Sequence, residues 1–237
     1  MTTAPPAYLL TLPAEASWQA LAATLDHTLL KPEATRDQVV KLCEEAAHYR
    51  FACAMVNPGW VAVAYSVLAG AGVPVGTVVG FPLGASLSTT KREETASLVK
   101  FGAHDIDMVI NIGQLKSGNN TAVAQDIRGV VEIAHEAGGI VKVILETCLL
   151  SVEEKLRGSQ LAVAAGADFL KTSTGFSTGG ATAADVALLR GVAGRDCGVK
   201  ASGGIRTLAD ARTMLDAGAN RLGTSGSVHI MRELGTR

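Results

Sequence analysis

The sequence predicts an α/β fold, namely a single (β/α)8 barrel over residues 1–237 in which residues 1–20 form an N-terminal extension or helix. Short apolar runs recur along the chain at a mean spacing of roughly 28 residues, which is the size of one βαβ unit. Most of these runs follow an Ala-rich amphipathic stretch that ends in glycine, as a helix does before it passes into a strand. A chain of 237 residues is a usual length for one such barrel.

The apolar runs are short and continuous, so they indicate parallel strands that are covered on both faces. The first two are Leu25–Leu30 and Phe51–Val56, and the last is Asn220–Gly223. Together the eight predicted strands lie near residues 25, 52, 76, 107, 142, 169, 199 and 221.

Amphipathic segments between the runs predict the helices, for example Arg36–Tyr49 and Thr121–Ala137. An open doubly wound sheet is the alternative, but no G-x-G-x-x-G turn follows the first strand, which argues against a dinucleotide site. The glycines expected to end helices are Gly70, Gly102, Gly138, Gly166, Gly198 and Gly218.

The composition argues against several classes of function. A formal net charge of −1, with 4% aromatic residues, offers no electrostatic or stacking surface for nucleic acid. The sequence has no apolar run of about 18 residues and no signal peptide, so we expect no membrane association and a cytoplasmic location. The four cysteines form no C-x-x-C pair and are expected to be free thiols rather than disulfides or metal ligands.

Two lysines end neighbouring predicted strands, where the active site of such a barrel lies. Lys171 ends the sixth strand and Lys200 ends the seventh. Burial disfavours an ammonium group, and a second cation nearby lowers its pKa further, so Lys171 becomes available as a neutral nucleophile. A lone inward lysine more often pairs with a carboxylate or a phosphate, but two on adjacent strands favour Schiff-base chemistry.

Carboxylates occupy the fourth predicted strand. Asp105 and Asp107 point to the same side because side chains alternate along a strand. A buried carboxylate needs a partner, and the lysines can supply one while Asp107 transfers protons directly or through water. Lys142, on the fifth strand, either completes a Lys-Asp-Lys cluster or serves only as an ion-pair partner.

Glycine-rich turns after the last two strands predict a phosphate site. Gly203 and Gly204 follow the seventh strand, and Gly223–Val228 follows the eighth and opens a short helix. Bare backbone N–H groups at glycines and at a helix N-terminus bind phosphate, and barrel enzymes often do so at this place. Arg206 either binds the phosphate or caps the loop after the seventh strand.

Six segments together resemble the deoxyribose-phosphate aldolase family, a family of Schiff-base-forming aldolases. The resemblance runs in order from about residue 22 to about residue 230. Its segments are Asp26–Pro32, Val56–Pro58, the Asp-Ile-Asp-Met-Val-Ile-Asn segment at 105–111, Val141–Thr147, Lys171–Gly175, and Lys200 with Ser202–Arg206.

The resemblance implies reversible cleavage of 2-deoxy-D-ribose 5-phosphate to D-glyceraldehyde 3-phosphate and acetaldehyde, without metal or cofactor. Lys171 would form the Schiff base, Lys200 would lower its pKa, and Asp107 would relay protons. Asp26 and Thr28 would lie near the sugar hydroxyls. The implied phosphate ligands are Gly175, Gly203, Gly204, Gly223, Thr224 and Ser225, and Lys142, Thr172 and Arg206 complete the predicted substrate-binding set.

The chain departs from the family pattern at four places. Met55 stands where many members have cysteine, Phe176 where some have lysine, and Gly226 where serine is common. The chain also has no tyrosine after Tyr65, whereas some members carry a C-terminal tyrosine that assists proton transfer. These differences bear on phosphate affinity and on the proton step.

Two other functions remain open at this point. One is a different Schiff-base barrel, such as a transaldolase that acts on a longer ketose phosphate. The other is a phosphosugar isomerase or binding protein that uses only the phosphate site. The apolar barrel ends are also compatible with a homodimer or a higher homo-oligomer.

Overall fold

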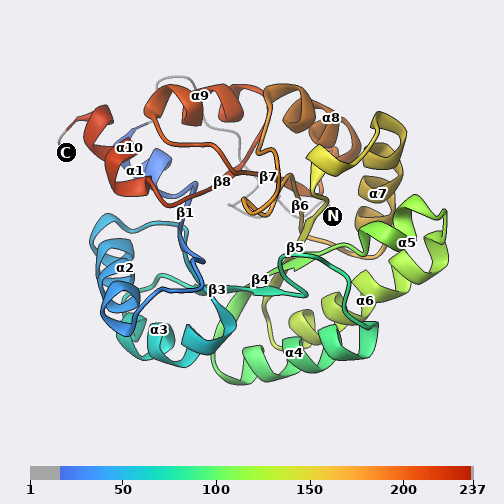
Figure 1. Ribbon diagram of the computed structural model, residues 1–237. Coiled ribbons are helices and arrows are strands. Elements are labelled where there is room, and N and C mark those ends of the chain that lie inside the picture. The colour runs from blue at the N-terminus through green and yellow to red at the C-terminus, as the bar shows by residue number, and fades with distance from the viewer. Residues whose placement is uncertain (1–16, 236–237) are drawn as a thin grey trace, which may run out of the picture.

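The computed structural model describes residues 17–235, whose strands form a closed barrel (Figure 1). Each strand pairs in parallel with the next one along the chain, and the last pairs with the first. The strands are β1 (Leu25–Leu29), β2 (Cys53–Val56), β3 (Val75–Val79), β4 (Ala103–Val109), β5 (Ile140–Ile144), β6 (Phe169–Lys171), β7 (Gly198–Ser202) and β8 (Arg221–Thr224). All eight predicted strands are therefore confirmed.

The helices surround the barrel in chain order, as the sequence of colours around the ring in Figure 1 shows. The predicted helix Arg36–Tyr49 is confirmed, and the second predicted helix is found one residue earlier, at Asn120–Glu136. The helices are α1 (Trp18–Ala22), α2 (Arg36–Tyr49), α3 (Val61–Leu68), α4 (Ser88–Lys100), α5 (Ile112–Lys116), α6 (Asn120–Glu136), α7 (Val152–Ala164), α8 (Ala183–Ala193), α9 (Leu208–Asp216) and α10 (Ser227–Leu234), with short 3-10 turns η2 (Pro58–Trp60) and η3 (Thr147–Leu149).

Local sequence explains where several helices begin. The side chains of Thr35 and Ser151 each accept a hydrogen bond from the third residue of the following helix. The side chain of that third residue returns a bond to the cap backbone, so two otherwise unpaired N–H groups are satisfied. Of the predicted extension 1–20, residues 1–16 lie outside the described residues, and α1 begins directly after its cap, Ser17.

The predicted helix-ending glycines are confirmed at five of the six positions. Gly70, Gly102, Gly138, Gly166 and Gly218 all have positive φ. The prediction for Gly198 is wrong, because this residue is the first of β7 and Gly194 ends α8 instead. A Cβ atom at position 198 would lie 2.2 Å from the Phe169 ring, so a close approach between strands requires glycine there.

Apolar side chains fill the layer between the strands and the helices, whereas charged side chains occupy the interior of the barrel. The main core includes Ile106, Val141 and Leu170, all fully buried. The alternate positions on the same strands carry Asp107, Lys142 and Lys171. Because side chains alternate along a strand, one side of each strand contributes to the hydrophobic layer and the other to the charged interior of the barrel.

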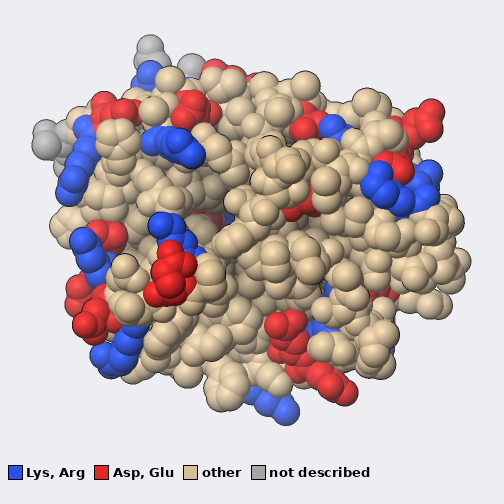
Figure 2. Space-filling model, in the orientation of Figure 1, with Lys and Arg blue, Asp and Glu red and all other residues tan. Residues whose placement is uncertain are grey.

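The surface carries charge of both signs. Figure 2 shows Lys and Arg interspersed with Asp and Glu around the edge of one face, without a large area of one sign. Within residues 17–235, no helix has the length and apolar character needed to cross a membrane.

Candidate active site

A cavity of about 370 Å³ opens at the carboxyl ends of the strands. Loops that follow β1, β6, β7 and β8 supply most of its lining. The predicted site residues that line it are Thr28, Lys171, Gly175, Lys200, Gly203, Gly204, Arg206, Gly223, Thr224 and Ser225. The structure thus brings together residues that lie up to about 200 positions apart in the sequence.

Lys171 ends β6 at the floor of this cavity, where it is 3% exposed. Its Nζ atom donates a hydrogen bond to Oδ2 of Asp107 at 2.6 Å. Burial lowers the pKa of Lys171 to about 8, with help from the nearby Lys200 and against the opposing effect of Asp107. With that pKa, about a quarter of the amine is neutral at pH 7.5, which is enough for it to act as a nucleophile.

Asp107 accepts from two lysines at one oxygen. The Nζ atom of Lys200 lies 2.7 Å from the same Oδ2 that Lys171 contacts. Burial alone would raise the pKa of Asp107, but Lys142, Lys171 and Lys200 outweigh it and hold this pKa well below its usual range. Asp107 is therefore a carboxylate that lies between the two predicted catalytic lysines.

Lys142 was predicted to contact the substrate, but it lies inside the barrel, away from the cavity lining. It is fully buried, is not among the residues that line the cavity, and lies 2.5 Å from Asp105 and 3.2 Å from Asp107. Burial lowers its pKa, but the carboxylates of Asp105, Asp107 and Asp26 outweigh this effect and raise the pKa above its usual value. The geometry therefore matches the ion-pair role that the sequence left open for Lys142.

Asp26 also lies beneath the cavity rather than in its lining. One of its carboxylate oxygens lies 2.6 Å from Lys200, and the other accepts from Arg221 at 2.5 Å. Arg221 also donates to Asp105 at 3.0 Å. Asp26 therefore holds Lys200 in place from below instead of contacting the sugar-binding space directly.

The buried charges balance only when Lys171 is neutral. Three carboxylates face three partner cations and Lys171, all at most 5% exposed. A net positive charge in a low-dielectric interior is costly, so the balance favours loss of the proton from Lys171. The carboxylates are Asp26, Asp105 and Asp107, and the partner cations are Lys142, Lys200 and Arg221.

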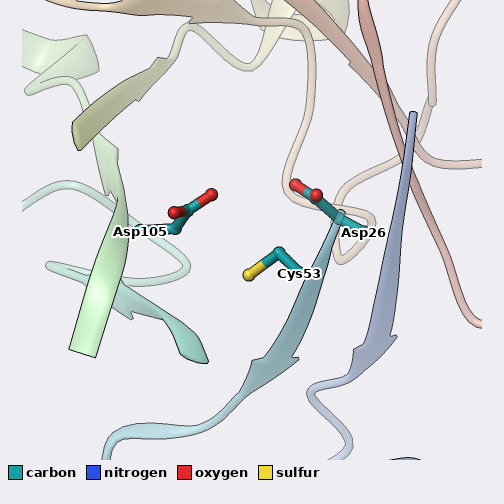
Figure 3. A group of neighbouring side chains, drawn as sticks. All are labelled: Asp26, Cys53 and Asp105. Atoms are coloured by element: carbon teal, nitrogen blue, oxygen red, sulfur yellow. The ribbon is translucent and has the colours of Figure 1, made fainter. Parts of the chain in front are cut away.

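Asp26, Cys53 and Asp105 point into the same space from β1, β2 and β4 (Figure 3), and their donor atoms lie within 4.8 Å of one another. Burial raises the pKa of the Cys53 thiol well above its usual value, and the two aspartates add to this effect. The carboxylates already bind Lys142 and Arg221. The ammonium group of Lys142 and the guanidinium group of Arg221 therefore already neutralise the carboxylates that a metal ion would need as ligands.

The two glycine-rich turns after β7 and β8, where the sequence predicts a phosphate site, both contribute residues to the cavity lining. Gly203 and Gly204 have φ values of 86° and 84°, a conformation that L side chains rarely adopt. A Cβ atom at Gly223 would lie 2.4 Å from Oγ of Ser202, so glycine is required there by close packing. These turns therefore bring backbone without side-chain cover to the cavity lining, and phosphate binding there stays a prediction.

The sequence matches the model of the DeoC/LacD family aldolases over residues 20–229. The chain belongs to this family. The aldolase is 56% identical to a deoxyribose-phosphate aldolase of Geobacillus sp. (strain WCH70), over 89% of the chain and 94% of the relative. It is 57% identical to the enzyme of that name from Streptococcus sanguinis (strain SK36), over 88% of the chain and 94% of the relative.

Solved structures agree with this assignment. A putative deoxyribose-phosphate aldolase from Coccidioides immitis superposes with a TM-score of 0.90 at 39% identity, covering 100% of the chain and 92% of that structure. A deoxyribose phosphate aldolase from Aeropyrum pernix, described as a unique tetrameric structure, has a TM-score of 0.87 at 36% identity, with 93% of each chain covered. The protein is thus an enzyme of the aldolase class and hence a lyase, which decides against the isomerase or binding-protein alternative.

Two polar residues of this aldolase, Arg221 and Ser202, were not predicted from the sequence as site residues. Arg221 belonged to a run interpreted only as a strand, although an arginine in a short buried strand indicates a paired carboxylate inside the barrel. Ser202 lines the cavity, and its buried Oγ has no hydrogen-bond partner among residues 17–235. Its hydroxyl is therefore an unpaired hydrogen-bonding group at the cavity.

Thr172 was predicted to contact substrate, but it is fully buried and is not among the residues that line the cavity. Its hydroxyl accepts from the N–H of Ser202 at 3.1 Å and thereby joins the ends of β6 and β7. Thr28 does line the cavity, and its hydroxyl donates to the carbonyl of Asp26 at 2.8 Å.

Two of the departures from the family pattern, Met55 and Phe176, line the cavity. Met55 lines it, next to Cys53, whose Sγ atom is 3.7 Å from the Met55 sulfur. Phe176 stands at the rim, 49% exposed, with its ring edge-to-face against Phe81. The backbone N–H of Gly226 donates to the Thr224 hydroxyl, so this position acts through its backbone.

Proposed function

We propose that this aldolase cleaves 2-deoxy-D-ribose 5-phosphate reversibly into D-glyceraldehyde 3-phosphate and acetaldehyde through a Schiff base on Lys171. The observation that carries the proposal is the placement of a desolvated lysine, with its pKa lowered to about 8, at the floor of a cavity whose wall includes the glycine-rich turns predicted to hold phosphate. The names of the relatives support the choice of substrate.

In the cleavage direction, the neutral amine of Lys171 attacks the C1 aldehyde of the open-chain sugar. The resulting carbinolamine loses water to give an iminium ion, which becomes the electron sink. Removal of the proton from the C3 hydroxyl breaks the C2–C3 bond and releases D-glyceraldehyde 3-phosphate. Protonation of the remaining enamine at C2 and hydrolysis of the iminium then release acetaldehyde and restore the amine.

Asp107 and Lys200 are proposed to handle the protons. Asp107 contacts both lysine nitrogens through one oxygen, so a proton that leaves Lys171 has an acceptor at 2.6 Å. Lys200 lines the cavity, and its ammonium group can donate a proton to a leaving hydroxyl, directly or through water. The proposed relay uses groups on β4, β6 and β7.

The phosphate end of the substrate is proposed to lie against Gly203, Gly204, Gly223 and Ser225, with Arg206 beside them. Backbone amides and one guanidinium supply directional donors for phosphate oxygens. The remaining space between this cradle and Lys171 then holds the hydroxyl-bearing carbons next to Thr28.

Borohydride reduction in the presence of acetaldehyde alone, followed by peptide mass spectrometry, tests the reaction class. We expect an ethyl group on Lys171 in the native protein and none in Lys171→Leu, which should also lose nearly all turnover. Lys41→Leu is the control, since that lysine is on the surface, with a side chain 75% exposed. Absence of an adduct at Lys171 would contradict the acetaldehyde-donor proposal and favour a barrel that uses a longer ketose donor.

We keep two further expectations with this proposal. A homo-oligomer is expected from the apolar barrel ends, and the tetrameric Aeropyrum pernix relative supports it. Light scattering during size-exclusion chromatography would measure the number of chains. The cytoplasmic location remains a prediction that fractionation of the source cells would test.

A further inference from the structure

The chain leaves β5 through a buried glutamate in an unusual conformation. Glu146 has φ 57° and ψ 64°, and the residue is only 2% exposed. A residue with a Cβ atom adopts this left-handed conformation only where the surrounding structure compensates for it. Glu146 therefore lies outside the regular alternation of side chains along β5, whose last residue is Ile144.

The Glu146 carboxylate accepts its main hydrogen bonds from Thr174, in the loop that follows β6. The Thr174 hydroxyl donates to its Oε2 atom, and the Thr174 N–H lies 3.3 and 3.4 Å from the two oxygens. Cys148 adds a weaker contact, with its Sγ atom 3.8 Å from Oε1. Within residues 17–235 no lysine, arginine or histidine forms an ion pair with this carboxylate, so these donors alone offset its burial.

Thr174, which Glu146 holds in place, in turn fixes the loop that forms part of the cavity wall. Its hydroxyl oxygen accepts from the N–H of Phe176 at 3.0 Å, so the backbone on both sides of Gly175 is held. Gly175 has φ 86°, and its Cα atom lies 3.6 Å from the position of a Cβ on Gly203. Fixing Thr174 therefore fixes Gly175 against the glycines of the phosphate cradle.

Lys171 itself is held by different bonds. Its carbonyl accepts from the N–H of Leu145 at 3.0 Å, and the next residue, Thr172, donates to the carbonyl of Lys200 at 3.1 Å. The lysine therefore keeps its position through strand pairing, whereas the loop from Thr174 to Phe176 depends on the glutamate. The two ends of the substrate site therefore depend on different groups, the backbone pairing of β5, β6 and β7 at one end and the side chain of Glu146 at the other.

We propose that Glu146 is a positioning residue that sets affinity for the phosphate group by clamping the loop of Thr174, Gly175 and Phe176, without acting on Schiff-base formation. The inference rests on the proposed function, which places the phosphate against Gly203 and Gly204, because Gly175 packs beside Gly203. Its consequence is a split between the two halves of the site: loss of the clamp weakens phosphate recognition and leaves the reactive amine unchanged.

Three variants and three measurements test the split. In Glu146→Ala, we expect the KM for 2-deoxy-D-ribose 5-phosphate and the Ki for inorganic phosphate each to rise by about tenfold or more. The rate at which borohydride traps acetaldehyde on Lys171 should stay within about twofold. Thr174→Val removes the hydroxyl from the other side and should raise KM and Ki similarly, while Glu146→Gln, which keeps one carbonyl acceptor, should show a smaller rise.

Two controls separate a specific clamp from general damage. Glu153→Ala changes an exposed glutamate in the first turn of α7 and should leave all three measurements unchanged. The double variant Glu146→Ala with Thr174→Val should be no worse than either single variant, because both remove the same interaction.

The inference is overturned if KM and Ki in Glu146→Ala stay within twofold of the native values, or if trapping at Lys171 falls in parallel with them. If Glu146→Ala does not fold, Glu146→Gln and Thr174→Val decide by the same criteria. If the native protein forms no acetaldehyde adduct, the proposed function fails, while calorimetry of inorganic phosphate binding to the same variants still decides the role of Glu146.

Discussion

Replacement of Lys200 by methionine removes the cation nearest to Lys171 while keeping a side chain of similar length. Both lysine nitrogens contact the same oxygen of Asp107, at 2.6 and 2.7 Å, so they lie within about 5 Å of each other. At an effective dielectric constant of about 20, two like charges at that distance repel by about 3 kcal/mol. Since one pKa unit corresponds to about 1.4 kcal/mol, the repulsion lowers the pKa of Lys171 by about two units.

The second effect of the change has the same sign. Without Lys200, the Asp107 carboxylate interacts more with Lys171 and stabilises its ammonium form, which raises its pKa. We therefore expect this pKa to move from about 8 toward about 10. The neutral fraction at pH 7.5 falls from about a quarter to about 0.3%, so Schiff-base formation slows by about 75-fold.

The assay is the initial rate of borohydride trapping with acetaldehyde, measured from pH 6 to pH 10. The rate should rise through an inflection that lies about two units higher in Lys200→Met, and the two proteins should approach each other at the alkaline end. Lys200→Arg retains the charge and should keep the native inflection, and it also serves if the methionine variant does not fold. An unchanged inflection with a uniform loss of rate would refute the electrostatic role of Lys200.

Three further predictions concern the rim, the cavity wall and the barrel. Arg206→Ala should raise the KM for the phosphorylated sugar by about tenfold in steady-state kinetics, whereas no change would mean that Arg206 only caps its loop. Met55→Cys places a thiol at the cavity and should shorten the half-life in concentrated acetaldehyde, and equal half-lives would contradict this. Gly198→Ala should destabilise the fold by about 1–3 kcal/mol in urea unfolding because its methyl group meets Phe169, while Gly191→Ala, which meets nothing within 4 Å, should not.

Much of the fold could be predicted because strand and helix periods are local properties of the chain. The continuous apolar runs and the intervening amphipathic segments located all eight strands. The prediction failed at Gly198, where glycine permits contact with the Phe169 ring of the adjacent strand. Before the partner strand is placed, such a glycine looks the same as one that ends a helix.

The site could be predicted where it depends on strand ends. Lys171, Lys200 and Asp107 could be identified because a closed barrel brings the carboxyl ends of its strands together. Arg221 could not be assigned, since its partner Asp26 lies 195 positions away and the two meet only when β8 pairs with β1. The charged residues beneath the cavity are therefore brought together only when the barrel closes.

The sequence by itself determined the barrel, the pair of lysines and the two glycine-rich turns, because each follows from residue type and spacing along short segments. Only the tertiary structure decided which charges pair, since Lys142 and Asp26 turn away from the cavity to support Asp107 and Lys200. The same holds for Glu146, whose partner Thr174 lies on the next loop. Electrostatic and hydrogen-bonding roles depend on distances across the barrel, and those distances exist only after all eight strands have closed.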